Sequence, residues 1–243
     1  MIISGSTDVG KKRDNNQDCF EICALSDFCS LMVVCDGMGG ANGGNIASTL
    51  ARDTIVKQIK AQYNQNMNGR SIKNMLISAV TAANITVFDK SLSVSSLSGM
   101  GTTTVAVIIS KGEAYIAHVG DSRAYLINTA AHSIEQITTD HSIVQMMVET
   151  GQITSVEAKV HPKRNIITRA IGVNDNVKVD FSERPVGADE KILLCSDGLS
   201  NFVSNDVIMN TLCANSGKDA VNILIDEANA NGGGDNITVV IAE

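Results

Sequence analysis

The stretch LMVVCDGMGG, residues 31–40, joins an apolar run to an aspartate and then to three glycines around one methionine. Five consecutive apolar residues are typical of a strand that is buried on both faces. Asp36-Gly37 then marks a turn, because glycine accepts a positive φ and aspartate bonds its own backbone. A second stretch, ILLCSDGL from Ile192, has the same form and places Asp197 after its apolar run. Two strands are therefore predicted to deliver a carboxylate at their ends.

Further strand-like stretches rich in Val, Ile, Leu and Cys recur on both sides of these two. They begin at Cys19, Phe28, Thr102, Glu113, Ser122, Asn176, Lys191 and Asn236. Lys111-Gly112 separates two of them as a tight hairpin, so neighbouring strands are predicted to be antiparallel.

Helical periodicity lies between the strand groups. In residues 44–62, Ile46, Leu50, Ile55 and Ile59 fall roughly on one face, and residues 71–90 carry a similar apolar stripe. Shorter helices are predicted at 142–150, 205–214 and 217–230. This grouping predicts an α+β fold, with antiparallel sheet packed against helices, in a single domain over residues 1–243.

The amino-acid composition limits the possible binding partners and the cellular compartment of the protein. The 243 residues include 26 acids and 19 bases, for a net charge of −7, which disfavours nucleic acid and membrane surfaces as partners. The six cysteines form no CxxC pair and the four histidines lie far apart, so a zinc site is not expected. The sequence shows neither a signal-peptide pattern nor a run that approaches a membrane span. We expect a cytoplasmic monomer with reduced cysteines.

Three more aspartates occupy comparable positions. Asp18 leads into the first long strand, Asp121 lies in a turn between two strands, and Asp235 precedes the last strand. Each one alone is ordinary turn chemistry. Together with Asp36 and Asp197 they are expected to gather at one edge of the sheets, where unpaired carboxylates repel unless cations lie between them.

All-oxygen ligands favour hard cations, so Mg²⁺ or Mn²⁺ fits this set better than zinc or copper. A glycine beside a ligand lets a backbone carbonyl approach the ion, and Gly37 is the candidate for that role. Arg13 lies five residues before Asp18. An arginine beside a metal site is a candidate phosphate clamp, because its planar guanidinium forms two parallel bonds to a phosphate.

The sequence resembles the metal-dependent serine/threonine phosphatases of type 2C, in their compact bacterial form. The resemblance rests on eight segments in order: TDVGKKRDNNQD (7–18), VCDGMGG (34–40), SGMGTT (98–103), HVGDSRAY (118–125), TTDHS (138–142), ITRAIG (167–172), LCSDGL (194–199) and GGDNITVV (233–240). It implies a four-layer α-β-β-α sandwich, in which two central antiparallel sheets are flanked by helices.

The resemblance also implies roles for individual residues. Asp36 would bridge two Mn²⁺ or Mg²⁺ ions, with the Gly37 carbonyl on the second. Asp197 and Asp235 would complete the shell of the first ion, and Asp18 would act partly through waters.

Other roles follow from the same resemblance. Asp121 and Asp197 would hold a third, weaker ion, and Arg13 would bind the substrate phosphate. Residues 142 to about 165 match a small flap beside the site. Phosphorylated proteins, targets of a serine/threonine kinase, would be the substrates.

The implied reaction is hydrolysis of phosphoserine and phosphothreonine. A water or hydroxide that bridges the two ions would attack in line, without a phosphoenzyme. Met38 stands where many eukaryotic members have a histidine proposed as general acid, so protonation of the leaving group has no assigned residue.

Two other functions compete with this interpretation. GSTDVGKK, residues 5–12, approaches a nucleotide-binding loop but has Lys12 where the motif needs Ser or Thr. The alternative from another class is a catalytically silent regulator, a pseudophosphatase that binds phosphoproteins on the same fold. The presence of every expected acidic ligand favours the enzyme.

Overall fold

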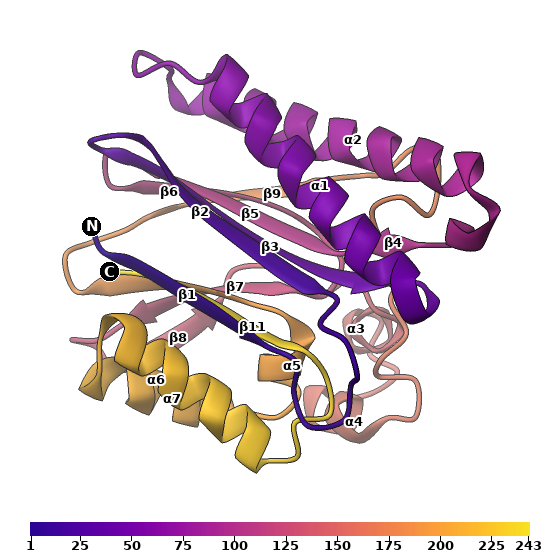
Figure 1. Cartoon of the computed structure of the whole chain (residues 1–243). Coiled ribbons are helices and arrows are strands. Elements are labelled where there is room, and N and C mark those ends of the chain that lie inside the picture. Colours follow the sequence, from indigo (N-terminus) through magenta and orange to yellow (C-terminus); the bar gives the residue numbers. More distant parts are fainter.

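The molecule has four layers, with two antiparallel sheets stacked at the centre and helices on both outer faces (Figure 1). This computed structural model describes residues 1–243, apart from the side chains of residues 41 and 42. The predicted α-β-β-α sandwich is confirmed.

Every paired strand runs antiparallel to its neighbour. The first sheet has the order β1 (Ile3–Asp8), β11 (Ile237–Ala242), β10 (Glu190–Cys195), β7 (Arg123–Asn128) and β8 (Ser133–Gln136). The second has the order β2 (Asp18–Ser26), β3 (Cys29–Met38), β5 (Thr104–Ser110), β6 (Glu113–Val119) and β9 (Asp180–Pro185), and β4 (Gly101–Thr102) pairs with β3. Lys111 and Gly112, with φ of 54° and 80°, form the predicted hairpin between β5 and β6.

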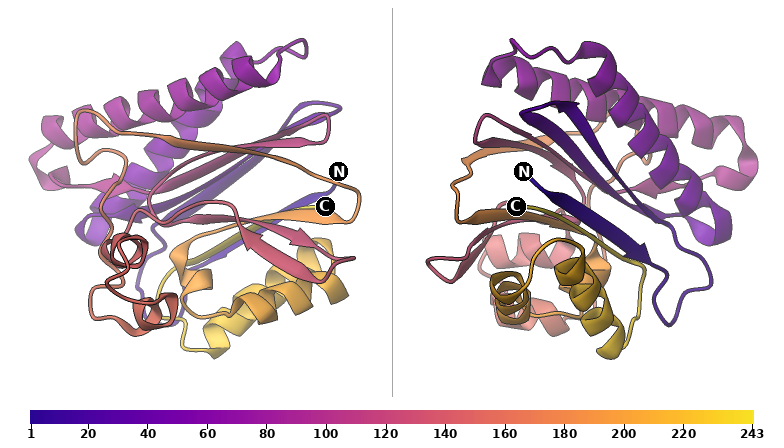
Figure 2. Two further views of the ribbon diagram at one scale, coloured as in Figure 1. Left: turned by 180° about the vertical axis from the view of Figure 1, so that it is seen from behind. Right: turned by 60° about the vertical axis from the view of Figure 1, so that its left-hand side comes forward.

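Helices cover the outer faces of both sheets. The second sheet carries α1 (Gly40–Gln62), α2 (Gly69–Ser93) and the short 3-10 helix η1 (Ser95–Leu97). The first sheet carries α5 (Asp197–Ser200), α6 (Asn205–Ala214) and α7 (Gly217–Ala230). The remaining two, α3 (Ile143–Glu149) and α4 (Ser155–Val160), lie together to one side of the sheets, as Figure 1 and the left view of Figure 2 show.

The continuous apolar runs of the sequence are strands that face a core on each side. In β3, Leu31, Val33 and Cys35 pack under α1 and α2. Met32 and Val34 point the other way, into the core between the two sheets. Since successive side chains of a strand alternate between faces, a strand buried on both faces needs apolar residues at every position. The stretch at residues 31–35 meets that need.

The N-terminal half of α1 differs from the predicted stripe. Ile55 and Ile59 are fully buried as expected, but Ile46 is 37% exposed. Ala47 and Ala51 face the sheet in its place, both fully buried. Small side chains let this end of the helix approach β3 closely, which an assignment by hydrophobicity alone misses.

Some elements carried no clear pattern in the sequence. β1 is ISGSTD, with too few large apolar residues to read as a strand, and it forms through its pairing with β11. β8 and α4 were not predicted either, since neither contributes a fully buried apolar face. β9 begins at Asp180, later than the expected Asn176.

Helix α2 is long and apolar enough, by length and composition alone, to cross a membrane. That finding corrects the expectation that no segment approaches such a span. Its predicted stripe of Ile72, Leu76, Ala79, Ala83 and Val87 is buried in the core over the second sheet. The apolar face of α2 is therefore already used inside the fold.

Candidate active site

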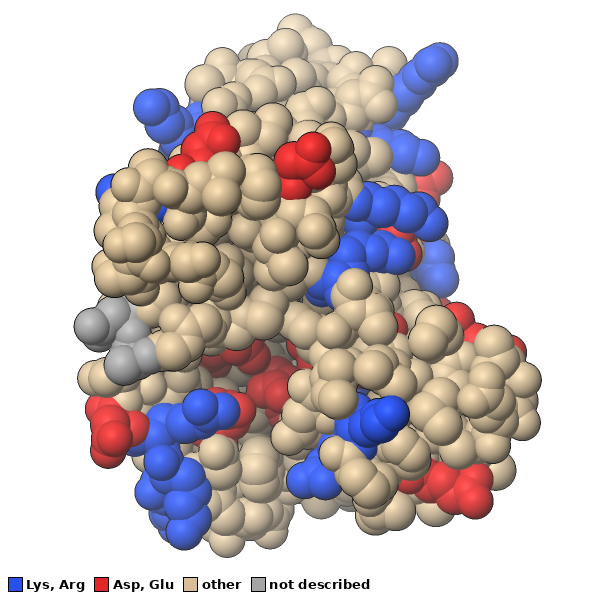
Figure 3. Space-filling model, turned by 90° about the vertical axis from the view of Figure 1, so that its right-hand side faces the viewer, with Lys and Arg blue, Asp and Glu red and all other residues tan. Residues whose placement is uncertain are grey.

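The ends of strands from both sheets meet around one cavity of about 520 Å³. Its lining includes six of the seven predicted site residues, namely Arg13, Asp36, Gly37, Asp121, Asp197 and Asp235. Figure 3 shows this hollow in the surface, with acidic atoms at its bottom and basic side chains on either side of its mouth. Residues far apart in the sequence are thus brought together as predicted.

Asp18, the seventh residue, does not line the cavity. It pairs with Asp36 across β2 and β3, and its side chain is buried. Its Oδ2 accepts hydrogen bonds from Ser196 Oγ (2.6 Å) and Thr238 Oγ1 (2.7 Å). Its Oδ1 is buried with no hydrogen-bond partner in the described residues.

Asp197 begins α5, directly after the end of β10. Its Oδ2 accepts a bond of 3.0 Å from Asn201 Nδ2, whereas Oδ1 is buried and, among the described residues, has no partner. Burial, followed by the charge of Asp235, raises the pKa of Asp197 to about 6.

Burial and mutual repulsion perturb the other carboxyls in the same sense. The pKa of Asp36 is raised well above its usual range, first by burial and then by Asp18, Asp197, Asp121 and Asp235. Burial, the main cause, raises the pKa of Asp18 and of Asp121 to about 7. Four neighbouring carboxyls thus resist ionisation when no cation is near them.

This donor set fits a divalent cation. Two buried carboxylate oxygens, Asp18 Oδ1 and Asp197 Oδ1, lack partners among the described residues, and an unpaired buried acceptor costs about 1–3 kcal/mol. A hard cation coordinated by oxygens would satisfy such atoms and relieve the repulsion.

Gly37 has a packing reason to be glycine. A Cβ at this position would lie 2.1 Å from the Gly44 carbonyl oxygen and 2.6 Å from that of Gln17. Its amide donates to the Gln17 carbonyl at 3.1 Å. The absence of a side chain therefore lets β3, the start of α1 and the loop before β2 meet beside the cavity.

Arg13 contacts the carboxylate group directly. Its Nη2 donates to Asp235 Oδ2 at 2.8 Å, and about half of the arginine side chain (52%) stays exposed. The guanidinium thus lies at the cavity wall with donors left for another anion.

Comparisons with known proteins identify the family to which the chain belongs. The family model described as protein phosphatase 2C matches residues 9–229. The chain belongs to the protein phosphatase 2C family. A serine/threonine phosphatase, stp, of Listeria monocytogenes is 36% identical over 238 residues, which cover 98% of this chain and 93% of the relative.

Solved structures of this family share the fold over nearly the whole chain. The Staphylococcus aureus serine/threonine phosphatase Stp1 matches with a TM-score of 0.92 and 36% identity, covering 100% of this chain and 94% of that one. The catalytic domain of the phosphatase PstP, solved in complex with two manganese ions, matches with a TM-score of 0.84 and 32% identity, covering 98% and 96%. The resemblance to bacterial type 2C phosphatases is confirmed.

Two residues that support the phosphatase 2C cavity were not singled out from the sequence. Asn236 accepts from the Gln17 amide (2.8 Å) and donates to the carbonyls of Val9 (2.8 Å) and Asn15 (3.0 Å). It thereby fixes the loop that carries Arg13. Asn236 belongs to the motif GGDNITVV, in which the sequence pattern marked only Asp235 as a ligand.

Thr103 is the second of them. Its amide donates to the Asp36 carbonyl (2.8 Å), and its Oγ1 accepts from the Asp36 amide (3.1 Å). The same hydroxyl shares a hydrogen bond of 2.7 Å with Ser122 Oγ. Thr103 thus couples the backbone of Asp36 to the turn that carries Asp121.

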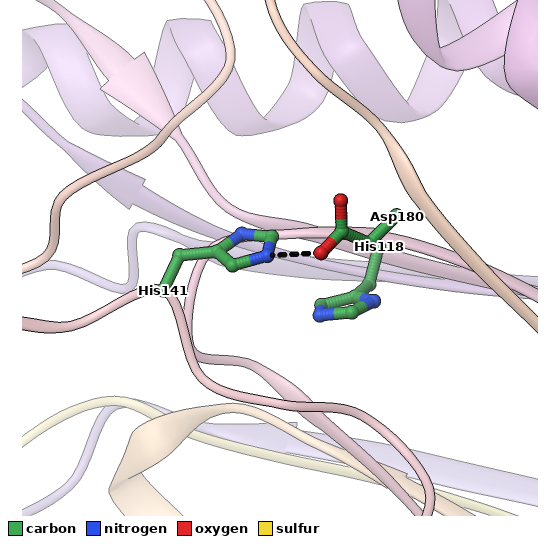
Figure 4. A group of neighbouring side chains, drawn as sticks. All are labelled: His118, His141 and Asp180. Carbon is green, nitrogen blue, oxygen red and sulfur yellow. Dashed lines mark hydrogen bonds and ion pairs between the residues drawn. The ribbon is translucent and has the colours of Figure 1, made fainter. Parts of the chain in front are cut away.

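A separate group of His118, His141 and Asp180 offers three ligand atoms within 4.8 Å of one another (Figure 4). Both ring nitrogens of His141 and both carboxylate oxygens of Asp180 already take part in hydrogen bonds. His141 Nδ1 accepts from the Gly120 amide (3.0 Å), so its Nε2 carries the proton and donates to Asp180 (3.1 Å).

The Arg169 guanidinium also occupies this group. Its Nη1 lies 2.9 Å from Asp180 Oδ1 and 2.8 Å from His141 Nε2, where a metal ion would need to be. His118 Nε2 donates to the Thr139 carbonyl at 2.9 Å. We interpret the group as a hydrogen-bonded support and not as a metal site.

Proposed function

We propose that this chain is a metal-dependent phosphatase that hydrolyses phosphoserine and phosphothreonine on proteins. One observation carries the proposal: four predicted carboxylates, Asp36, Asp121, Asp197 and Asp235, line one cavity, and Asp18 is buried opposite Asp36. Two buried oxygens of this group, Asp18 Oδ1 and Asp197 Oδ1, have no partner among the described residues. Membership of the phosphatase 2C family and the names of its bacterial relatives support the same activity. No observation favours the catalytically silent alternative.

The carboxylates would hold divalent ions, Mn²⁺ or Mg²⁺. We assign Asp36, Asp197 and Asp235, with the Gly37 carbonyl and the deeper Asp18, to a core site for two ions. Asp121 and Asp197 would hold a third, weaker ion. Such ions, when bound, supply an activated water and neutralise the charge that develops on the phosphoryl group.

The side chains around that site would orient the substrate. Arg13 keeps free donors at the cavity wall, which suits a phosphate monoester held by two parallel bonds. Its contact with Asp235 sets the direction of the guanidinium. Met38 also lines the cavity but carries no transferable proton, so the leaving group would take its proton from another source.

We further propose one domain over residues 1–243, with residues 142–165 as a flap. Both ends of this segment are tied at the same place. The Ile143 amide donates to the Ile166 carbonyl (2.9 Å), and the Thr168 amide donates to the His141 carbonyl (2.7 Å). A segment that leaves and re-enters the fold at one point is expected to act as a unit.

The substrates would be phosphorylated proteins that are targets of a serine/threonine kinase. The enzyme would act as a monomer in the cytoplasm. All six cysteines are free, and Cys19 lies directly opposite Cys35 on two paired strands without forming a disulfide. Such unbonded thiols are typical of a reducing compartment.

The test is turnover of a phosphothreonine peptide and of a small aryl phosphate, with Mn²⁺ and with EDTA. We expect activity with Mn²⁺ and none with EDTA, and we expect Asp36→Asn to lose activity in both assays while remaining folded by circular dichroism. Manganese binding by calorimetry should weaken in the same variant. Metal-independent hydrolysis, or full activity of Asp36→Asn, would refute the proposal.

A further inference from the structure

A second cavity of about 440 Å³ adjoins the first one. We call it the outer cavity; it lies between helices α3 and α4 on one side and the residues from the end of α5 to the start of α6 on the other. Asp121 and Asp197 line both cavities, so the two adjoin at these residues. A peptide bound with one residue at the carboxylates would be within reach of the outer cavity through another of its residues.

Two cations at the edge of the outer cavity are not neutralised. Lys159 and Arg164 line it and are exposed, and within the described part of the chain neither forms an ion pair. Glu157, the acid of α4, is held by its own helix start, where it accepts from the Thr154 amide (2.7 Å) and hydroxyl (2.8 Å). The positive charge of this edge is therefore directed at a ligand or at solvent.

The acidic residues of the outer cavity do not cancel this charge. Asp140 forms a two-pronged ion pair with Arg123, through bonds of 2.7–3.1 Å. Asp121 and Asp197 belong to the proposed ion site, and their charge would be offset by bound cations. In the ion-loaded protein the outer cavity is thus positive overall, which favours an anion.

The remaining lining is rich in groups that donate hydrogen bonds to oxygen. Ser204 and Asn205 lie at the N-terminal end of the ten-residue helix α6. The side-chain amides of Gln145 and Asn201 also line the outer cavity; each donates one bond, to Glu149 (3.1 Å) and Asp197 (3.0 Å), and has a second N–H. A phosphate group suits this lining better than a carboxylate, because it has about two negative charges and three strong acceptor oxygens. An arginine beside a lysine is a typical phosphate-binding pair.

We propose, on the basis of the function proposed above, that the outer cavity binds a second phosphorylated side chain of the same substrate. Lys159 and Arg164 contact that second phosphate while the first one lies at Arg13 and the carboxylates. The preferred substrates are then segments that carry two phosphates a few residues apart.

The test compares three sets of peptides that share one phosphothreonine. The first set has alanine at a second position, the second set has phosphoserine there and the third has glutamate, with the spacing varied in each set. We expect kcat/KM for the best doubly phosphorylated peptide to exceed that of its alanine counterpart about tenfold, the gain of roughly one charge-assisted bond, mainly through a lower KM.

The double variant Lys159→Ala with Arg164→Ala should lose most of this preference. Its turnover of the singly phosphorylated peptide and of the aryl phosphate should stay unchanged, which also reports that it is folded and active. Lys159→Arg with Arg164→Lys should keep the preference. Lys163→Ala is the matched control, because Lys163 is an exposed base of the same segment that does not line the outer cavity.

Three results would overturn the inference. These are equal kcat/KM for singly and doubly phosphorylated peptides at every spacing, an equal gain with glutamate, and an equal loss in Lys163→Ala. Failure of the wild type to hydrolyse any phosphopeptide would instead refute the proposed function. The two failures are therefore distinguishable.

Discussion

The ring of His141 accepts, through Nδ1, a hydrogen bond of 3.0 Å from the backbone amide of Gly120. The His141 amide in turn donates one of 3.0 Å to the Gly120 carbonyl. Gly120 has a φ of +108°, and a Cβ there would lie 2.6 Å from the side chain of Thr103. Because Asp121 follows Gly120, its position at the cavity depends on this contact. Asp180 holds the ring from the other side.

The first prediction concerns His141→Ala. The change leaves the buried Gly120 amide without its acceptor, so the free energy of unfolding in EDTA should fall by about 1–3 kcal/mol in urea titrations. Since the turn of Asp121 loosens, activity should also need a higher Mn²⁺ concentration for half saturation, with little change in KM for a phosphopeptide. His161→Ala is the control, because the only hydrogen bond of the His161 ring to the described residues is with the Lys163 amide in its own turn. An unchanged Mn²⁺ titration would show that His141 does not position Asp121.

The second prediction concerns pH and Asp121→Asn in the metal-free protein. Burial and Asp197 raise the pKa of Asp121 to about 7, against about 3.9 in an unfolded chain. A raised pKa means that the folded state binds the proton more tightly, so the stability it contributes is present at low pH and lost as pH rises towards 7. The amide variant does not titrate. From pH 4 to pH 8 its stability relative to wild type should therefore increase by roughly 2–4 kcal/mol.

Urea unfolding at each pH measures this difference. Saturating Mn²⁺ should reverse the order at pH 8, since only the wild type keeps the full set of carboxylates for the ions. If the metal-free variant did not gain stability relative to wild type between pH 4 and pH 8, the raised pKa of Asp121 would be contradicted.

The central strands and the acidic residues could be predicted from the sequence for one physical reason. Runs such as residues 31–35 are apolar at every position because both faces are buried, and the Asp36 and Asp197 that follow them interrupt the apolar pattern abruptly. Within one sheet, antiparallel pairing places Asp18 opposite Asp36, and the stacking of the two sheets brings Asp197 to the same cavity.

The remaining features depend on contacts between distant segments. β1 is held by pairing with β11, across more than 200 residues, and its own sequence is weakly strand-forming. Asn236 and Thr103 act through backbone groups that only the folded chain brings near them. The prediction that Ile46 faces the sheet was wrong for the same reason. In the folded chain Ala47, and not Ile46, is buried against the sheet at the start of α1.

The third prediction is that Gly37→Ala destabilises the fold and the ion site together. The new Cβ would collide with the carbonyl oxygens of Gly44 and Gln17, at 2.1 and 2.6 Å, and backbone atoms there cannot simply rotate away. We expect a loss of about 1–3 kcal/mol in the free energy of unfolding, typical of overpacking, and weaker Mn²⁺ binding by calorimetry. Gly187→Ala is the matched control, because the nearest atom to its new Cβ is the end of the Glu190 side chain at 3.5 Å. Equal stability of the two variants would contradict the close packing at Gly37.

The last prediction separates phosphate binding from ion binding at Arg13. Arg13→Ala removes the free guanidinium donors, so kcat/KM for a phosphothreonine peptide should fall by an amount equivalent to about 1.5–3 kcal/mol, the range for charged hydrogen bonds. Asp235 loses its cationic neighbour at 2.8 Å, so the carboxylate cluster becomes more negative and Mn²⁺ affinity should stay equal or rise. Steady-state kinetics and manganese calorimetry on the same preparation measure the two effects. Arg184→Ala, an arginine on β9 whose ion pair with Glu135 is 3.5 Å long, provides the control and should change neither. A loss of Mn²⁺ affinity that matched the loss of kcat/KM would instead mean that Arg13 supports the ion site and does not bind the phosphate.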